Sequence, residues 1–124
     1  MNNSNNITHF LNKLFNEWIE KKIIFLVLRN YSDLPEFIEN DVDILVSPKQ
    51  LKKAEGILYN SINDTNWVLI NKSKFSCLAY YFYNTQTLEV IHIDLMPGNR
   101  WYSFSFINDQ MMLNTRKSFK SFFI

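Results

Sequence analysis

A change of hydrophobic spacing near residue 22 constrains this chain more than any other feature of its sequence. From Ile7 to Ile19, apolar residues recur three and four positions apart, which is the spacing that lines one face of a helix. Ile23 to Leu28 then form an unbroken aliphatic run, typical of a strand that is buried on both faces. The sequence therefore predicts a helix over about 6–21, followed directly by a strand over about 23–28.

The rest of the chain continues with strands and helices separated by turn-forming residues. Pro35 and its polar neighbours predict a loop over 29–40, and Pro48 after Ser47 is typical of a capped helix start. The expected elements are a strand at 41–46, a helix at 48–62, strands at 67–71, 75–83 and 88–96, an edge strand or apolar loop at 101–107, and a last helix covering 111–117.

This order of elements predicts an α/β (α+β) fold with a mixed β-sheet and helices mainly on one face. The strands between residues 67 and 96 are joined by short turns, so they pair antiparallel and a purely parallel sheet is excluded. A chain of 124 residues fits one compact domain, and we expect residues 1–124 to form it.

Composition excludes several functional classes. Two glycines cannot supply a dinucleotide fingerprint or a phosphate-binding P-loop, and one cysteine with two histidines cannot form a Cys/His zinc cage or a disulfide framework. A formal charge of +1 leaves no strong nucleic-acid footprint. The longest apolar run has six residues, against the roughly 20 needed to span a bilayer, so no membrane contact is expected. The low cysteine content favours a reducing cytoplasm.

Two acids stand in the second expected strand, where aspartate is unfavourable. Because alternate side chains of a strand share a face, Asp41 and Asp43 point the same way, while Val42 and Ile44 point to the other side. Two carboxylates about 6–7 Å apart repel each other unless a cation lies near them. A hard divalent ion such as Mg²⁺ suits these oxygen ligands.

A third acid, Asp94, lies between Ile93 and Leu95 in a later strand and shares a face with His92. If that strand is the neighbour of strand 41–46, the three aspartates converge on one patch with the outline of a two-metal carboxylate site. The alternatives are solvent-facing acids at the start of a strand for the first pair, and an edge-strand acid for Asp94. We interpret His92 as a partly buried neighbour of the site, since hard cations prefer oxygen.

The segments Leu28-Arg29-Asn30-Tyr31 to Leu34-Pro35, Asn40-Asp41-Val42-Asp43-Ile44-Leu45-Val46 and His92-Ile93-Asp94-Leu95 together resemble uncharacterised bacterial nucleotidyltransferases of the DNA polymerase beta-like superfamily. The resemblance covers about residues 23–124. It implies that Asp41 and Asp43 hold catalytic magnesium, with two ions as the upper number. It also implies that Asp94 completes the metal site and helps to deprotonate the acceptor. The implied reaction transfers a nucleoside monophosphate from a nucleoside triphosphate to an unknown acceptor and releases pyrophosphate.

The chain departs from this family at the triphosphate grip, because the Gly-Ser pair that usually precedes the two aspartates is missing. Relatives often carry glycine where Asn30 stands, and asparagine tolerates left-handed backbone geometry. We expect Arg29, Asn30 and Ser32 to bind substrate, with a structural ion pair as the alternative for Arg29. The alternative function is a noncatalytic module of the same fold that binds a nucleotide or a partner protein. A metal nuclease ranks last, since no lysine stands close to Asp43 or Asp94.

The sequence ends on three apolar residues, Phe122, Phe123 and Ile124. Similar proteins continue with a largely helical part, so the resemblance implies that the C-terminal helical part is lacking here. We expect residues 119–124 to pack on another chain, either a second copy in a homo-oligomer or a partner protein.

Overall fold

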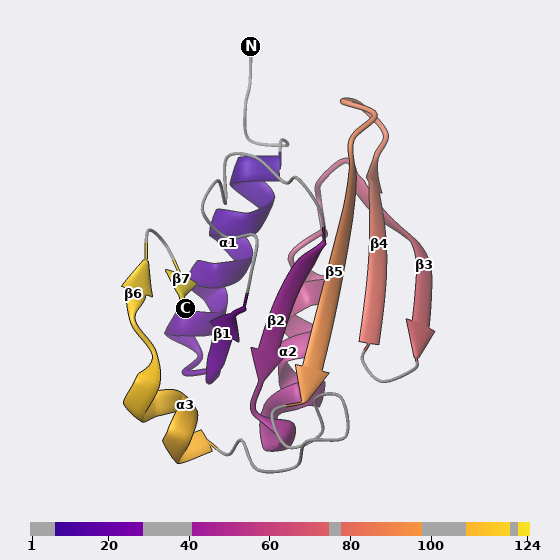
Figure 1. Ribbon diagram of the computed structural model, residues 1–124. Coiled ribbons are helices and arrows are strands. Elements are labelled where there is room, and N and C mark those ends of the chain that lie inside the picture. The colour runs from indigo at the N-terminus through magenta and orange to yellow at the C-terminus, as the bar shows by residue number, and fades with distance from the viewer. Residues whose placement is uncertain (1–6, 29–40, 75–77, 98–108, 120–121) are drawn as a thin grey trace.

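The computed structural model describes residues 7–28, 41–74, 78–97, 109–119 and 122–124 (Figure 1). None of the helices in these ranges is long and apolar enough to cross a membrane. The predicted loop 29–40 and the segment 101–107 lie outside the described residues. In chain order the elements are α1 (Ile7–Glu20), β1 (Phe25–Val27), β2 (Val42–Val46), the 3-10 helix η2 (Pro48–Gln50), α2 (Leu51–Asn60), β3 (Trp67–Lys74), β4 (Leu78–Asn84), β5 (Val90–Pro97), α3 (Asp109–Thr115), β6 (Ser118–Phe119) and β7 (Phe122–Phe123).

Helix α1 buries one face, as its apolar spacing predicts, through Phe10, Leu11, Leu14, Phe15 and Trp18. Ile19, which we expected on the same face, is 40% exposed. The helix ends where Lys22 adopts a φ of 60°. There the Ile23 amide donates to the Trp18 carbonyl oxygen at 2.9 Å. This is the left-handed turn that commonly closes a helix and that usually carries glycine.

One five-stranded sheet has the order β1-β2-β5-β4-β3 (Figure 1). Strands β2 and β5 are parallel, and the other neighbouring pairs are antiparallel. The Asn84 side chain closes the turn between β4 and β5 by accepting the Gln86 and Thr87 amides at 2.9 and 3.0 Å. The predicted α+β class with a mixed sheet is confirmed.

The main core lies between the sheet and helices α1 and α2, and α2 runs behind β2 and β5 in Figure 1. Alternate residues of β1, β2, β4 and β5 enter this core, including Val42, Ile44 and Val46 of β2 and Ile91, Ile93 and Leu95 of β5. A smaller cluster on the opposite face joins Leu45 and Met96 to Met112 of α3. The two longer helices thus cover one face, while the short α3 packs on the other.

Some boundaries differ from the prediction for local reasons. Strand β5 begins at Val90 rather than 88, because Leu88 has a φ of 64° that no strand residue adopts. Strand β3 continues to Lys74, since it stays paired with β4 beyond a bulge between Leu69 and Asn71. Pro48 does begin a helical turn, but the Ser47 side chain makes no capping hydrogen bond.

The C-terminal residues pack against the domain itself. Phe122 is 2% exposed, and its ring centroid lies 5.0 Å from that of Phe15. The Phe123 ring meets Phe25 edge to face at 5.8 Å. Contact of this tail with another chain stays a prediction.

Candidate functional site

Asp43 and Asp94 lie side by side on the sheet face that α1 and α2 do not cover. Strands β2 and β5 are parallel neighbours, and their register places Asp43 opposite Asp94. Val42 and Ile44 belong to the main core on the helix-covered face, so the acid between them points to the opposite face. Asp43 is only 4% exposed. The sheet therefore holds one buried acid from each of two central strands at the same level.

His92 connects the two acid-bearing strands. Its Nε2 lies 2.7 Å from Asp94 Oδ1, and its Nδ1 lies 2.8 Å from Asp41 Oδ1 at the start of β2. The Tyr81 ring of β4 stacks on the imidazole with ring centroids 4.2 Å apart. This stack restricts the imidazole plane, so both ring nitrogens meet a carboxylate.

Burial has the largest effect on the ionisation of Asp94, whose side chain is 13% exposed. Burial raises the pKa of Asp94, and the adjacent His92 acts in the opposite direction. A hydrogen bond with Asp43 and the charge of Asp41 raise this pKa further. The net shift is upward, so the site disfavours a negative charge on Asp94 unless a cation balances it.

Asp41, His92 and Asp94 form a group that could hold a metal ion, because one ligand atom from each lies within 4.8 Å of the others. Asp43 adds a fourth donor residue through its contact with Asp94. Carboxylate oxygens suit Mg²⁺ or Mn²⁺, and an imidazole nitrogen extends the choice to softer divalent ions.

The predicted site residues divide into two sets. Asp41, Asp43 and Asp94 converge on one patch, whereas Arg29, Asn30 and Ser32 lie outside the described residues. The edge-strand alternative for Asp94 is wrong, because β5 lies between β2 and β4. Asp41, with 49% of its side chain exposed, does face solvent, and Asp43 does not.

His92 is the residue whose involvement sequence reasoning understated. It is partly buried, as expected, with 23% of its side chain exposed. Its shared face with Asp94 follows from strand alternation, but its contact with Asp41 depends on the pairing of β2 with β5. Only the sheet order could reveal that bridge.

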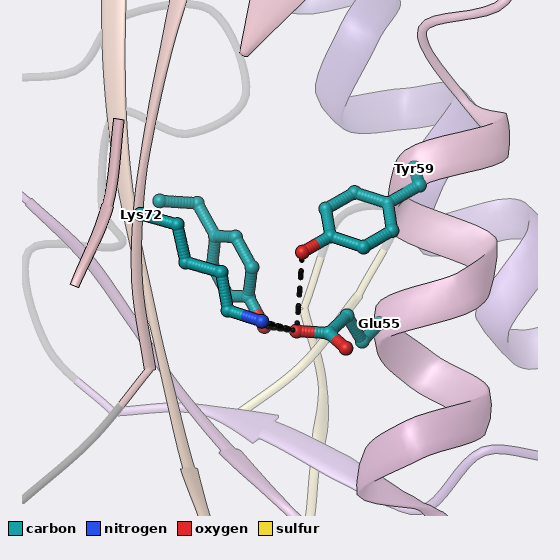
Figure 2. A network of polar contacts seen from close by, with 4 residues as sticks. Glu55, Tyr59 and Lys72 are labelled. Atoms are coloured by element: carbon teal, nitrogen blue, oxygen red, sulfur yellow. Dashed lines mark hydrogen bonds and ion pairs between the residues drawn. The ribbon is translucent and has the colours of Figure 1, made fainter. Parts of the chain in front are cut away.

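A second polar cluster, centred on Glu55, lies on the helix-covered face, and Figure 2 shows it. Glu55 Oε2 of α2 lies 2.7 Å from Lys72 Nζ of β3 and also accepts the Tyr59 and Tyr80 hydroxyls. Burial opposes the charged form of Glu55, but the hydrogen bonds from Lys72 and Tyr80 outweigh it and lower its pKa. Burial, together with Glu55, raises the pKa of Tyr80, so its hydroxyl stays protonated and donates. This cluster ties α2 to the sheet.

Comparisons with family models, with curated proteins and with solved structures found no match to this chain. The arrangement of the acids on β2 and β5 therefore carries the functional argument.

Proposed function

We propose that this domain is a Mg²⁺-dependent nucleotidyltransferase of the cytoplasm that transfers a nucleoside monophosphate from a nucleoside triphosphate to an acceptor. The observation that carries the proposal is the register of β2 and β5, which sets Asp43 beside Asp94. Asp41 lies on the same patch, linked to Asp94 through His92. The family resemblance of the sequence assigns these three aspartates to the catalytic site.

The donor set fits magnesium. Three carboxylates offer oxygen ligands, and a bound cation would offset the burial that raises the pKa of Asp94. Asp41, Asp43 and Asp94 would hold one or two ions. Bound Mg²⁺ would neutralise the charge that develops on the transferring phosphoryl group.

The residues of the chain have separate roles in the proposed reaction. Asp94 takes the proton of the acceptor hydroxyl, whose oxygen forms a bond to the α-phosphorus of the nucleotide. The bond from that phosphorus to the bridging oxygen breaks, and pyrophosphate leaves with the electron pair. Arg29, Asn30 and Ser32 are proposed to bind the triphosphate. Tyr81 keeps the His92 ring in the plane that positions Asp41 and Asp94.

A second candidate is a noncatalytic module of the same fold that binds a nucleotide or a partner protein. One structural observation favours it: His92 contacts both Asp41 and Asp94, so these carboxylates have a counter-charge within the chain when the imidazole is protonated. The missing Gly-Ser pair of the sequence favours it too.

Calorimetric titration with each nucleoside triphosphate, with and without Mg²⁺, separates the two candidates. If the domain is the proposed enzyme, nucleotide binding should depend on Mg²⁺, and Asp43→Asn should abolish it. Asp64→Asn is the matched control, because it removes the same charge from an exposed turn, and asparagine tolerates the φ of 60° found there. Binding that ignores Mg²⁺ supports the module instead. Absence of binding to any nucleotide contradicts the enzyme.

A further inference from the structure

A pocket separate from the acid cluster lies where the end of α1 and the start of β1 meet the C-terminal segment. It has a volume of about 330 Å³, at the small end of the ligand-pocket range. Its apolar walls come from Ile19, Ile23 and Ile24 on one side and Leu113 and Phe123 on the other. Ile19 and Leu113 are 40% and 39% exposed, so the hollow leaves apolar surface open to a ligand.

Two cations, Lys22 and Arg116, complete the lining, and none of the acids in the described residues belongs to it. Among the described residues, neither side chain forms an ion pair. Two unbalanced positive charges beside an apolar hollow favour a ligand that combines a negative group with an apolar body.

The backbone of Lys22 is held in an unfavourable conformation. Its φ is 60°, its amide donates to the Ile19 carbonyl oxygen at 3.0 Å, and its carbonyl oxygen accepts Gln50 Nε2 at 3.0 Å. Glycine would adopt this left-handed turn at lower cost. Lysine is unusual at this left-handed position, and Lys22 belongs to the lining of the pocket.

Arg116 is held in place by the pocket itself. Its guanidinium carbon lies 4.1 Å from the centroid of the Phe123 ring, a cation–π contact. That ring in turn packs on Phe25. A guanidinium stacked on an aromatic ring loses little freedom when its N–H groups bind a carboxylate in a bidentate manner.

We infer that this pocket binds a small monocarboxylate with an aliphatic body, the carboxylate between Lys22 and Arg116 and the chain against Ile19, Ile24 and Leu113. Such a ligand would bridge α1 and the C-terminal segment. The site is independent of the nucleotidyltransferase proposal, because none of its residues belongs to the acid cluster on β2 and β5.

Isothermal titration of the full chain with octanoate tests this inference. We expect saturable binding with one site per chain. Acetate lacks the apolar body, while 1-octanol and octylamine lack the negative charge, so each should bind at least roughly tenfold more weakly, the loss of about one charge-assisted contact. Equal binding of octanoate and 1-octanol, or no saturable binding of octanoate, would overturn the inference.

Matched variants locate the site. Lys22→Gln should weaken octanoate binding roughly tenfold, and Lys21→Gln, with the same loss of charge outside the pocket, should leave it unchanged. Lys22→Gly is a second variant that suits the backbone conformation and so retains the fold. Equal octanoate affinity in the wild-type chain and both Lys22 variants would contradict the assignment. Asp43→Asn should not alter octanoate binding, which separates this test from that of the proposed enzyme.

Discussion

At the scale of single residues, the most informative feature is the buried carboxyl pair formed by Asp43 and Asp94. The two acids lie at one level of neighbouring strands, and burial raises the pKa of Asp94 because it penalises the charged carboxylate. Under the proposed function, binding of a cation would offset the cost of burying this carboxylate.

Asp94→Asn should raise the free energy of unfolding of the metal-free protein at pH 7. The pKa of Asp94 is raised above 3.8 in the folded protein. The folded state therefore loses stability as the pH rises from 3.8 through this raised pKa, because the carboxyl ionises less readily in the folded than in the unfolded chain. A neutral amide at this position removes that loss. In the wild type, Mg²⁺ at one hundred times its dissociation constant should add about 2.7 kcal/mol, and in the variant none. Urea unfolding with and without Mg²⁺ measures both. A metal-free variant less stable than wild type would show that the His92 contact outweighs the burial penalty.

The convergence of Asp43 and Asp94 could be anticipated from sequence because each is an acid between aliphatic residues, and Asp41 shares the face of Asp43 by strand alternation. The bridge from His92 to Asp41 could not, because these residues are far apart in the chain and meet only through the pairing of β2 with β5. Local pattern identifies which residues share a face of one strand, while the order of strands in the sheet decides which strands are neighbours.

At the scale of elements, the Glu55 cluster shows how a polar group can join a helix to an exposed edge strand. Strand β3 is at the edge of the sheet and has mostly exposed side chains. The carboxylate of Glu55 provides the connection through Lys72 (Figure 2), and it also accepts the Tyr80 hydroxyl.

Glu55→Gln should lower the free energy of unfolding at pH 7 by about 1 kcal/mol, a value reduced for solvent screening because the Lys72 side chain is 37% exposed. The folded-state pKa of Glu55 lies below 4.5, so its stabilising effect is present above that pH and disappears as the pH falls through the folded-state pKa. Urea unfolding of both proteins at pH 7 and at pH near 3 checks this.

The exposed acid Glu20 provides the control, since Glu20→Gln should change stability by less than about 0.5 kcal/mol. If Glu55→Gln lowers the free energy of unfolding equally at pH 7 and at the lowest pH, then packing of the side chain, and not its charge, stabilises the contact.

The sequence predicted the types of the helices and strands better than it predicted their first and last residues. The helical spacing of α1 and the alternation in β2 were visible, because both patterns report burial directly. The late start of β5 depends on the positive φ of Leu88, and the length of β3 depends on a bulge opposite β4. The residue types indicate neither feature, because leucine rarely adopts a positive φ and the bulge contains no glycine.

At the scale of the whole molecule, the C-terminal residues join the main core. Phe122 packs with Phe15 of α1, so residues at the two ends of the described chain stabilise each other. Spacing alone did not predict this, because β6 and β7 have two residues each and no recognisable period.

Phe122→Ala should therefore destabilise the domain by about 3–4 kcal/mol, the loss typical of a buried aromatic side chain. Leu113→Ala, at a residue 39% exposed, should cost clearly less. Thermal unfolding monitored by circular dichroism provides the comparison. Equal effects of the two substitutions would mean that the tail contributes little to the core.

The parallel pairing of β2 with β5 has a consequence for how the protein can misfold. A register shift of one residue between these strands would bring Ile93 or Leu95 opposite Asp43. It would also turn the Asp94 side chain toward the hydrophobic core. The correct alignment and the cluster of Asp41, Asp43 and Asp94 therefore form together or fail together. Under the proposed function, the return of Mg²⁺ binding during refolding would report when the central strands reach their native alignment.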